Sequence, residues 1–166
     1  MKSLPEPAVL LAGFALAHSV WSVSDLTGSD LLVPVAVVEA RGERHLQRFG
    51  AATQADAIAT GKLAMRNATS TSDAWAFARD GAIVEGGDRV DVLTVEFWGR
   101  GMNDPAVLLQ KYRPAATQEG FRLLGDPVLV IDGSVQSSDL ITAVLKVVAA
   151  GIQSHKQAAG RWDGWR

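Results

Sequence analysis

The chain has 166 residues and a mass of 17.6 kDa, which suits one domain that buries a substantial hydrophobic core. Hydrophobic residues make up 48% of it and charged residues 20%, a composition that excludes an intrinsically disordered chain. With 16 Lys and Arg against 18 Asp and Glu, the net charge of −2 offers no basic surface for phosphate backbones. We therefore expect no nucleic-acid partner.

The chain contains no cysteine, which excludes disulfides, thiol nucleophiles and thiolate metal sites and favours a cytoplasmic location. The three histidines, His18, His45 and His155, are not at metal-ligand spacing in the sequence, so we expect no metal site. The sequence also lacks a Walker loop, a dinucleotide-binding glycine motif and a nucleophile elbow. On these grounds we expect no cofactor.

The first predicted element is a helix over residues 8–24, entered through Pro5 and Pro7 and ended by the turn-forming residues 25–30. Large apolar side chains cover more than half of its circumference, which predicts a helix that is buried on most sides. The apolar run is shorter than the roughly 20 residues of a membrane span, so we expect no membrane partner. Lys2 followed by the apolar run 8–17 also fits the alternative of a signal peptide.

Two β-rich segments follow, of which the first spans residues 31–40 and the second residues 43–49, joined at Gly42. They predict a β-hairpin whose first strand is central and whose charged second strand lies at an edge or is half-exposed. Thr53 and Asp56 indicate the start of a second helix, which continues to residue 68 and has an apolar face made mostly of alanine and glycine.

Three strands are predicted next, over residues 74–79, 82–84 and 90–98, with a hairpin turn at Asp80-Gly81 and a further turn at Gly86-Gly87. Asp104-Pro105 indicates a short helix that ends before Pro114. A broken or paired strand over residues 120–132 and a last helix from about residue 138 to 157 complete the chain. The glycine-containing tail, residues 161–166, is not expected to be helical.

This order of elements predicts an α+β fold, with a mixed, mainly antiparallel sheet built from a hairpin and a meander and packed by two or three long helices. No internal repeat and no long linker divides the chain. We therefore expect a single domain over residues 1–166.

Two glutamates, Glu39 and Glu96, each follow an apolar or β-branched run near a strand end. Desolvation there would raise a carboxyl pKa toward the range of a general acid or base, but ion pairs with nearby arginines explain the same positions. Trp98, Arg100 and Tyr112 are the further candidates for a ligand-binding pocket that accepts an anion or an aromatic ring.

The leading hypothesis from these residues is a self-associating intracellular domain, a homo-oligomer, that binds a small molecule or a protein partner. Its basis is the excess of apolar side chains in the first and last helices. The alternative is a small hydrolase or isomerase that uses a strand-borne glutamate together with a histidine. A module that binds another protein through an exposed apolar patch is a third possibility.

Overall fold

A computed structural model describes residues 4–26 and 30–166, apart from the side chain of Ser138. The predicted signal-peptide residue Lys2 and part of the predicted turn 25–30 lie outside these residues. The fold is α+β, as predicted from the sequence, and its elements follow in chain order: α1 (Glu6–Val23), β1 (Val35–Ala40), β2 (Glu43–Arg48), α2 (Gln54–Ala68), β3 (Ala74–Glu85), β4 (Asp88–Gly99), β5 (Ala106–Arg113), β6 (Arg122–Leu123), β7 (Val128–Ile131), β8 (Ser134–Val135), α3 (Ser138–Gln153), α4 (Lys156–Ala159) and α5 (Trp162–Trp165).

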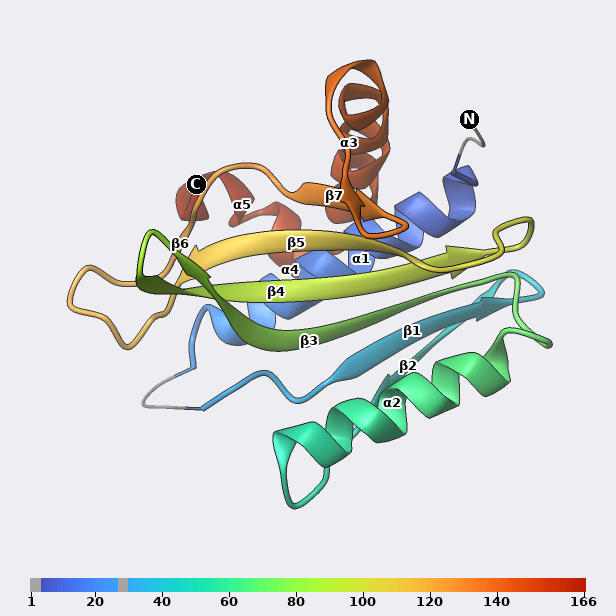
Figure 1. Cartoon of the computed structure of the whole chain (residues 1–166), viewed down its shortest axis with the longest axis horizontal. Coiled ribbons are helices and arrows are strands. Elements are labelled where there is room, and N and C mark those ends of the chain that lie inside the picture. The colour runs from blue at the N-terminus through green and yellow to red at the C-terminus, as the bar shows by residue number, and fades with distance from the viewer. Residues whose placement is uncertain (1–3, 27–29) are drawn as a thin grey trace.

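One open antiparallel sheet forms the centre of the molecule, with the strand order β2-β1-β3-β4-β5-β7-β8 and with β6 paired to β5 (Figure 1). All pairings between the described strands are antiparallel. The predicted hairpin of β1 and β2 is present, and β2 is the edge strand, since its six residues are all exposed.

Helices lie on both faces of this sheet. In Figure 1, α1 runs behind the central strands and α2 lies along the β1 end of the sheet. Alternate strand residues divide accordingly: Val35 and Val37 join the core under α1, whereas Ala36 and Phe77 join a smaller cluster with Met65 of α2. We call these two sides the α1 face and the α2 face.

Helix α1 is buried on most sides, as its apolar circumference predicts. By length and composition it is also apolar enough to cross a membrane, but 67% of it is buried inside the structure. It crosses α3 at Gly13 and Gly151, where a Cβ added to Gly151 would lie 2.2 Å from the carbonyl oxygen of Leu10. Only glycine permits this backbone approach.

The predicted turn at Asp80-Gly81 is wrong. Strand β3 continues without interruption to Glu85, and the chain reverses at Gly86-Gly87. Both of these glycines have positive φ angles, +57° and +86°, as a two-residue hairpin turn of type I′ requires, whereas Gly81 has none. Two long strands, β3 and β4, therefore take the place of the three strands predicted over residues 74–79, 82–84 and 90–98.

The predicted short helix after Pro105 is also wrong, because residues 106–113 form strand β5. Burial alternates along it residue by residue, so the period-two pattern of the side chains outweighs the helix-start signal of Asp104-Pro105.

The C-terminal helices differ from their prediction as well. α3 ends at Gln153, and the His155 side chain then caps α4 by accepting a hydrogen bond from the Ala158 amide at 3.1 Å. The tail forms the one-turn helix α5 because Trp165 is buried against Phe121, with ring centroids 6.0 Å apart. Tertiary contacts, which are absent from local sequence patterns, hold this turn.

Candidate ligand-binding pocket

A pocket of about 460 Å³ opens on the α2 face, between α2 and the ends of β3 and β4. It contains two of the predicted site residues, Glu96 and Trp98. Its walls combine aromatic, basic and acidic side chains, and its lining is Lys62, Met65, Arg66, Thr69, Trp75, Glu96, Trp98, Asn103, Asp104 and Pro105.

Two stacked tryptophans form the floor of this pocket. Trp75 and Trp98 are opposite each other on β3 and β4, and their rings lie 6.5 Å apart at 22°. Each indole N–H has a partner within the protein: Trp75 donates to the Thr69 hydroxyl and Trp98 to the Met102 carbonyl, both at 2.9 Å. Because the ring edges are satisfied, the indoles offer a ligand apolar contact rather than hydrogen bonds.

Glu96 lies beside this floor and is held by two cations. The Arg79 guanidinium donates to its carboxylate at 2.5 Å, and the Lys62 ammonium lies 3.8 Å from the same oxygen. The side chains of Glu96 and Arg79 are each 19% exposed, which strengthens this pair relative to a surface ion pair. The carboxylate therefore positions Lys62 at the pocket rim.

Helix α2 presents the basic wall. The Thr53 hydroxyl caps it by accepting from the Asp56 amide at 3.1 Å, as the sequence predicts. A Cβ on Gly61 would meet the Phe77 ring at 2.3 Å, so glycine lets α2 lie close to the sheet. Lys62 and Arg66 are four residues apart and so project from the same side of the helix, toward the pocket.

Glu39 is on the opposite side of the sheet. It lies on the α1 face of β1 and pairs with Arg44 of β2, whose Nε is 2.9 Å from its carboxylate. It lines a separate pocket of about 270 Å³ with Pro7 and Leu10 of α1. The sheet therefore separates the two glutamates that the sequence singled out.

Arg100 follows β4 and is exposed, but it is not free. Its Nε donates to the Asp73 carboxylate at 3.1 Å, and the same carboxylate accepts from the Arg41 amide at 3.0 Å. The hydrogen bond from the Arg41 amide has the larger effect and the one from Arg100 the smaller, and both hold the pKa of Asp73 below its usual value. Arg100 thus ties the end of β4 to the β1–β2 turn, outside the residues that line the pocket.

Tyr112 is buried on the α1 face, away from the pocket. Its hydroxyl donates to Asp80 at 2.6 Å, and the Asp80 carboxylate also accepts from the amides of Leu32 at 3.1 Å and Gly81 at 3.1 Å. Burial raises the pKa of Asp80 despite these bonds, and burial together with Asp80 raises the pKa of Tyr112. The pair anchors the segment before β1, which explains why the predicted strand over residues 31–40 begins only at Val35.

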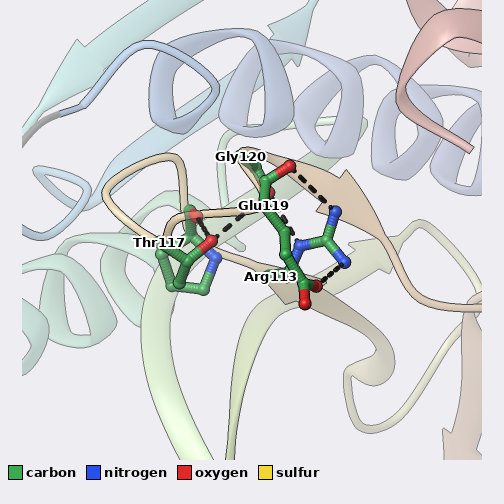
Figure 2. Close-up of polar contacts among 5 residues, drawn as sticks. Arg113, Thr117, Glu119 and Gly120 are labelled. Carbon is green, nitrogen blue, oxygen red and sulfur yellow. Dashed lines mark hydrogen bonds and ion pairs between the residues drawn. The ribbon is translucent and has the colours of Figure 1, made fainter.

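The neighbouring Arg113 is occupied by its own loop (Figure 2). Its guanidinium donates to the carbonyl oxygens of Gly120 at 2.8 Å and Glu119 at 3.2 Å and to the Glu119 carboxylate at 2.7 Å. Thr117 closes the same loop by donating to the Pro114 carbonyl at 2.8 Å. This network holds the loop that places Phe121 between Tyr112 and Trp165.

Sequence reasoning missed the contribution of α2 and Trp75 to the pocket, although both elements were predicted. The i, i+4 spacing of Lys62 and Arg66 was visible, but nothing local indicated that this side of the helix faces a tryptophan pair on β3 and β4. A larger pocket of about 510 Å³ lies between the β4–β5 loop and β7, and none of its lining residues within the described part of the chain is aromatic or basic. We therefore regard the α2-face pocket as the candidate site.

In the part of the chain that the structure describes, no group of three or more His, Asp or Glu side chains is arranged to hold a metal ion. Comparison with models of protein families, with curated proteins and with solved structures finds no match to this chain.

Proposed function

We propose that this protein is a non-catalytic domain whose α2-face pocket binds a small molecule with a flat apolar body and an anionic group. The observation that carries this proposal is the position of Lys62 and Arg66 at the rim above the stacked indoles of Trp75 and Trp98. The indoles would bury the apolar body, and the two cations would pair with the anion.

Binding is favoured over the hydrolase or isomerase alternative by the partners of the two glutamates. Glu96 and Glu39 both line pockets, but each is paired with an arginine, and no hydrogen bond or ion pair joins either to a histidine within residues 4–26 and 30–166. The hydrolase or isomerase alternative requires a glutamate that acts together with a histidine, and each glutamate has an arginine as its partner instead.

A fluorescent naphthalene sulfonate that carries an anilino group tests the proposal, because it combines a flat apolar body with one negative charge. Its neutral counterpart, the same ring system without the sulfonate, is the matched ligand control. We expect the sulfonate to bind saturably and at least about tenfold more tightly than the neutral dye, a difference of ~1.4 kcal/mol.

Arg66→Gln should reduce this preference, because it removes a pocket cation without disturbing the buried floor. Lys146→Gln, on the exposed side of α3, is the control and should bind like the parent. Near-UV circular dichroism of each variant establishes that the dye reports on a packed protein and not on a loosened core. Equal affinity for the two dyes, or no effect of Arg66→Gln, would contradict the proposal.

Self-association of this domain in the cytoplasm is a second proposal, supported by an uncovered part of the α2 face. α2 lies at the β1 end, and none of the helices that the structure describes lies over β5 and β7 on this side in Figure 1. The side chains there are apolar and mostly half-buried, and Val135 is 68% exposed. They are Val107, Leu109, Val128, Val130 and Val135, which share this face by register.

A further inference from the structure

The free edge of the sheet at β2 combines an unpaired backbone with two arginines on one face. β2 is the terminal strand of the described sheet, and all six of its residues are exposed. The Phe49 amide donates to the Pro34 carbonyl at 2.8 Å, and this bond identifies which residue pairs of the β1–β2 hairpin are hydrogen-bonded to each other. Since paired residues alternate along an antiparallel ladder, residues 43, 45 and 47 point their backbone groups toward β1.

The backbone groups of Arg44, Leu46 and Arg48 therefore point outward from the sheet. The side chains of these same three residues lie on the α1 face, because their partners on β1 are Glu39, Val37 and Val35. Edge strands with open backbone groups are templates for the addition of another strand. This strand would meet a basic, an apolar and a basic side chain at alternate positions.

The surface beside these residues is aromatic. The Arg44 guanidinium lies 5.2 Å from the centroid of Phe14 on α1. Phe14 and Trp21 are half-buried on the least covered side of α1, and Leu46 is 43% exposed. A strand added to β2 would place the side chains of one of its faces against this apolar strip.

We propose that β2 binds an extended acidic peptide, which adds as an antiparallel strand with acidic residues opposite Arg44 and Arg48 and an apolar residue opposite Leu46. Charge complementarity selects this occupant. In the described part of the chain, Arg48 has no carboxylate partner, and Glu39 is the one carboxylate that pairs with Arg44. The peptide would supply the missing negative charge while its backbone pairs with the outward amides and carbonyls.

A second copy of the chain fits this edge poorly. In the antiparallel pairing that forms the most hydrogen-bonded residue pairs within β2, Leu46 of each copy lies on the two-fold axis. Arg44 of one protomer is then directly opposite Arg48 of the other, twice in the interface. Like charges at directly opposed positions destabilise a strand pair. The edge charges therefore oppose self-pairing while they favour an acidic strand.

The test uses a short synthetic peptide with glutamate, valine and glutamate at alternate positions, separated by threonine, and isothermal titration against the full chain. N-methylation of the valine amide removes a hydrogen bond to β2, whereas N-methylation of the adjacent threonine amide, which points away, is the matched control. We expect the first change to weaken binding at least about tenfold, or ~1.4 kcal/mol, and the second to leave affinity within about twofold.

Arg48→Glu tests the charge argument on the protein side. The variant should bind the glutamate peptide at least about tenfold more weakly. It should gain affinity for a second peptide, in which lysine replaces each glutamate. The control variant Arg122→Glu, on exposed β6, should change neither affinity. Arg48 is exposed, so the thermal midpoint should stay near that of the parent. The proposal is overturned by equal binding of the glutamate and lysine peptides, by indifference to valine N-methylation, or by a dimer of the parent chain that Arg48→Glu strengthens in light scattering, because opposite charges would then face each other in a self-paired edge.

Discussion

The Nδ1 atom of His18 lies 3.1 Å from the Nε2 atom of His155, which joins α1 to the start of α4 across 137 positions of sequence. The Ala158 amide donates to Nδ1 of His155, so the proton of that ring resides on Nε2, which then donates to His18. This chain of donors requires both rings to be neutral. The rings of Phe14 and Trp21 lie 5.2 Å and 5.7 Å from that of His155 and complete the cluster.

Acidification should destabilise the fold through this pair. Burial, then His155 and Arg48, lower the pKa of His18 from 6.5 to about 4, and burial lowers the pKa of His155. Between pH 6.5 and about 4, the unfolded chain therefore binds more protons than the folded protein. The contribution of His18 to the free energy of unfolding is thus fully present above pH 6.5 and is lost as the pH falls toward 4. We expect His18 to reduce the free energy of unfolding by about 3 kcal/mol between pH ~7 and pH ~4, measured by urea denaturation.

The variant His18→Gln isolates this contribution, because glutamine accepts a hydrogen bond from His155 but does not titrate in this range. Its free energy of unfolding should depend less steeply on pH than that of the parent. His45→Gln, at an exposed position of β2, should retain the parental slope. If the slope of His18→Gln equals that of the parent, the pair does not control acid stability.

Gly151→Ala should destabilise the protein even though alanine is the better helix former. A Cβ at this position would lie 2.2 Å from the Leu10 carbonyl oxygen and 3.0 Å from Cα of Gly13, so α1 and α3 must move apart. Such overpacking costs about 1–3 kcal/mol, against a gain of about 1 kcal/mol from helix propensity. Thermal unfolding measures the result. Gly164→Ala, which meets nothing within 4 Å, should be neutral or stabilising.

Tyr112→Phe should lower the free energy of unfolding by about 1–2 kcal/mol, because it removes the 2.6 Å hydrogen bond to Asp80 while keeping the ring in place. The hydroxyl also lowers the pKa of the Asp80 carboxyl, so its loss should raise that pKa further. Urea denaturation and NMR titration of the carboxyl carbon report the two effects. Unchanged stability would show that the Leu32 and Gly81 amides suffice to hold Asp80.

Light scattering tests self-association through the uncovered part of the α2 face. The parent should be a dimer or higher oligomer at micromolar concentration, and Leu109→Lys should shift it toward monomer by placing a charge in the centre of this apolar surface. Leu63→Lys, at a 53% exposed position on α2, is the control and should associate like the parent. A monomeric parent would refute self-association.

Much of the fold follows from local patterns. The apolar circumference of α1 predicted its burial, and the charges of β2 predicted an edge strand. The errors arose where two local signals competed, as at Asp80, whose dipeptide with Gly81 resembles a turn but lies inside β3. The pairing of β3 with β4 over twelve positions decided this case, since a long ladder outweighs a single turn propensity.

The candidate site was predictable only in part. Glu96 and Trp98 are two residues apart on one strand, so period-two geometry places them on the same face from sequence alone. The strand order, however, separates Glu39 and Tyr112 from them. The local sequence determines on which face of a strand a side chain lies. The topology of the whole chain determines which helix covers that face.

By itself, then, the sequence determined a cysteine-free α+β domain with a buried first helix, because composition and periodicity act residue by residue. Only the tertiary structure decided that His18 meets His155, that Gly13 meets Gly151, and that Lys62 lies near Glu96. These contacts join residues far apart in the chain. Their distances depend on how the helices pack on the two faces of one sheet, which no local pattern encodes.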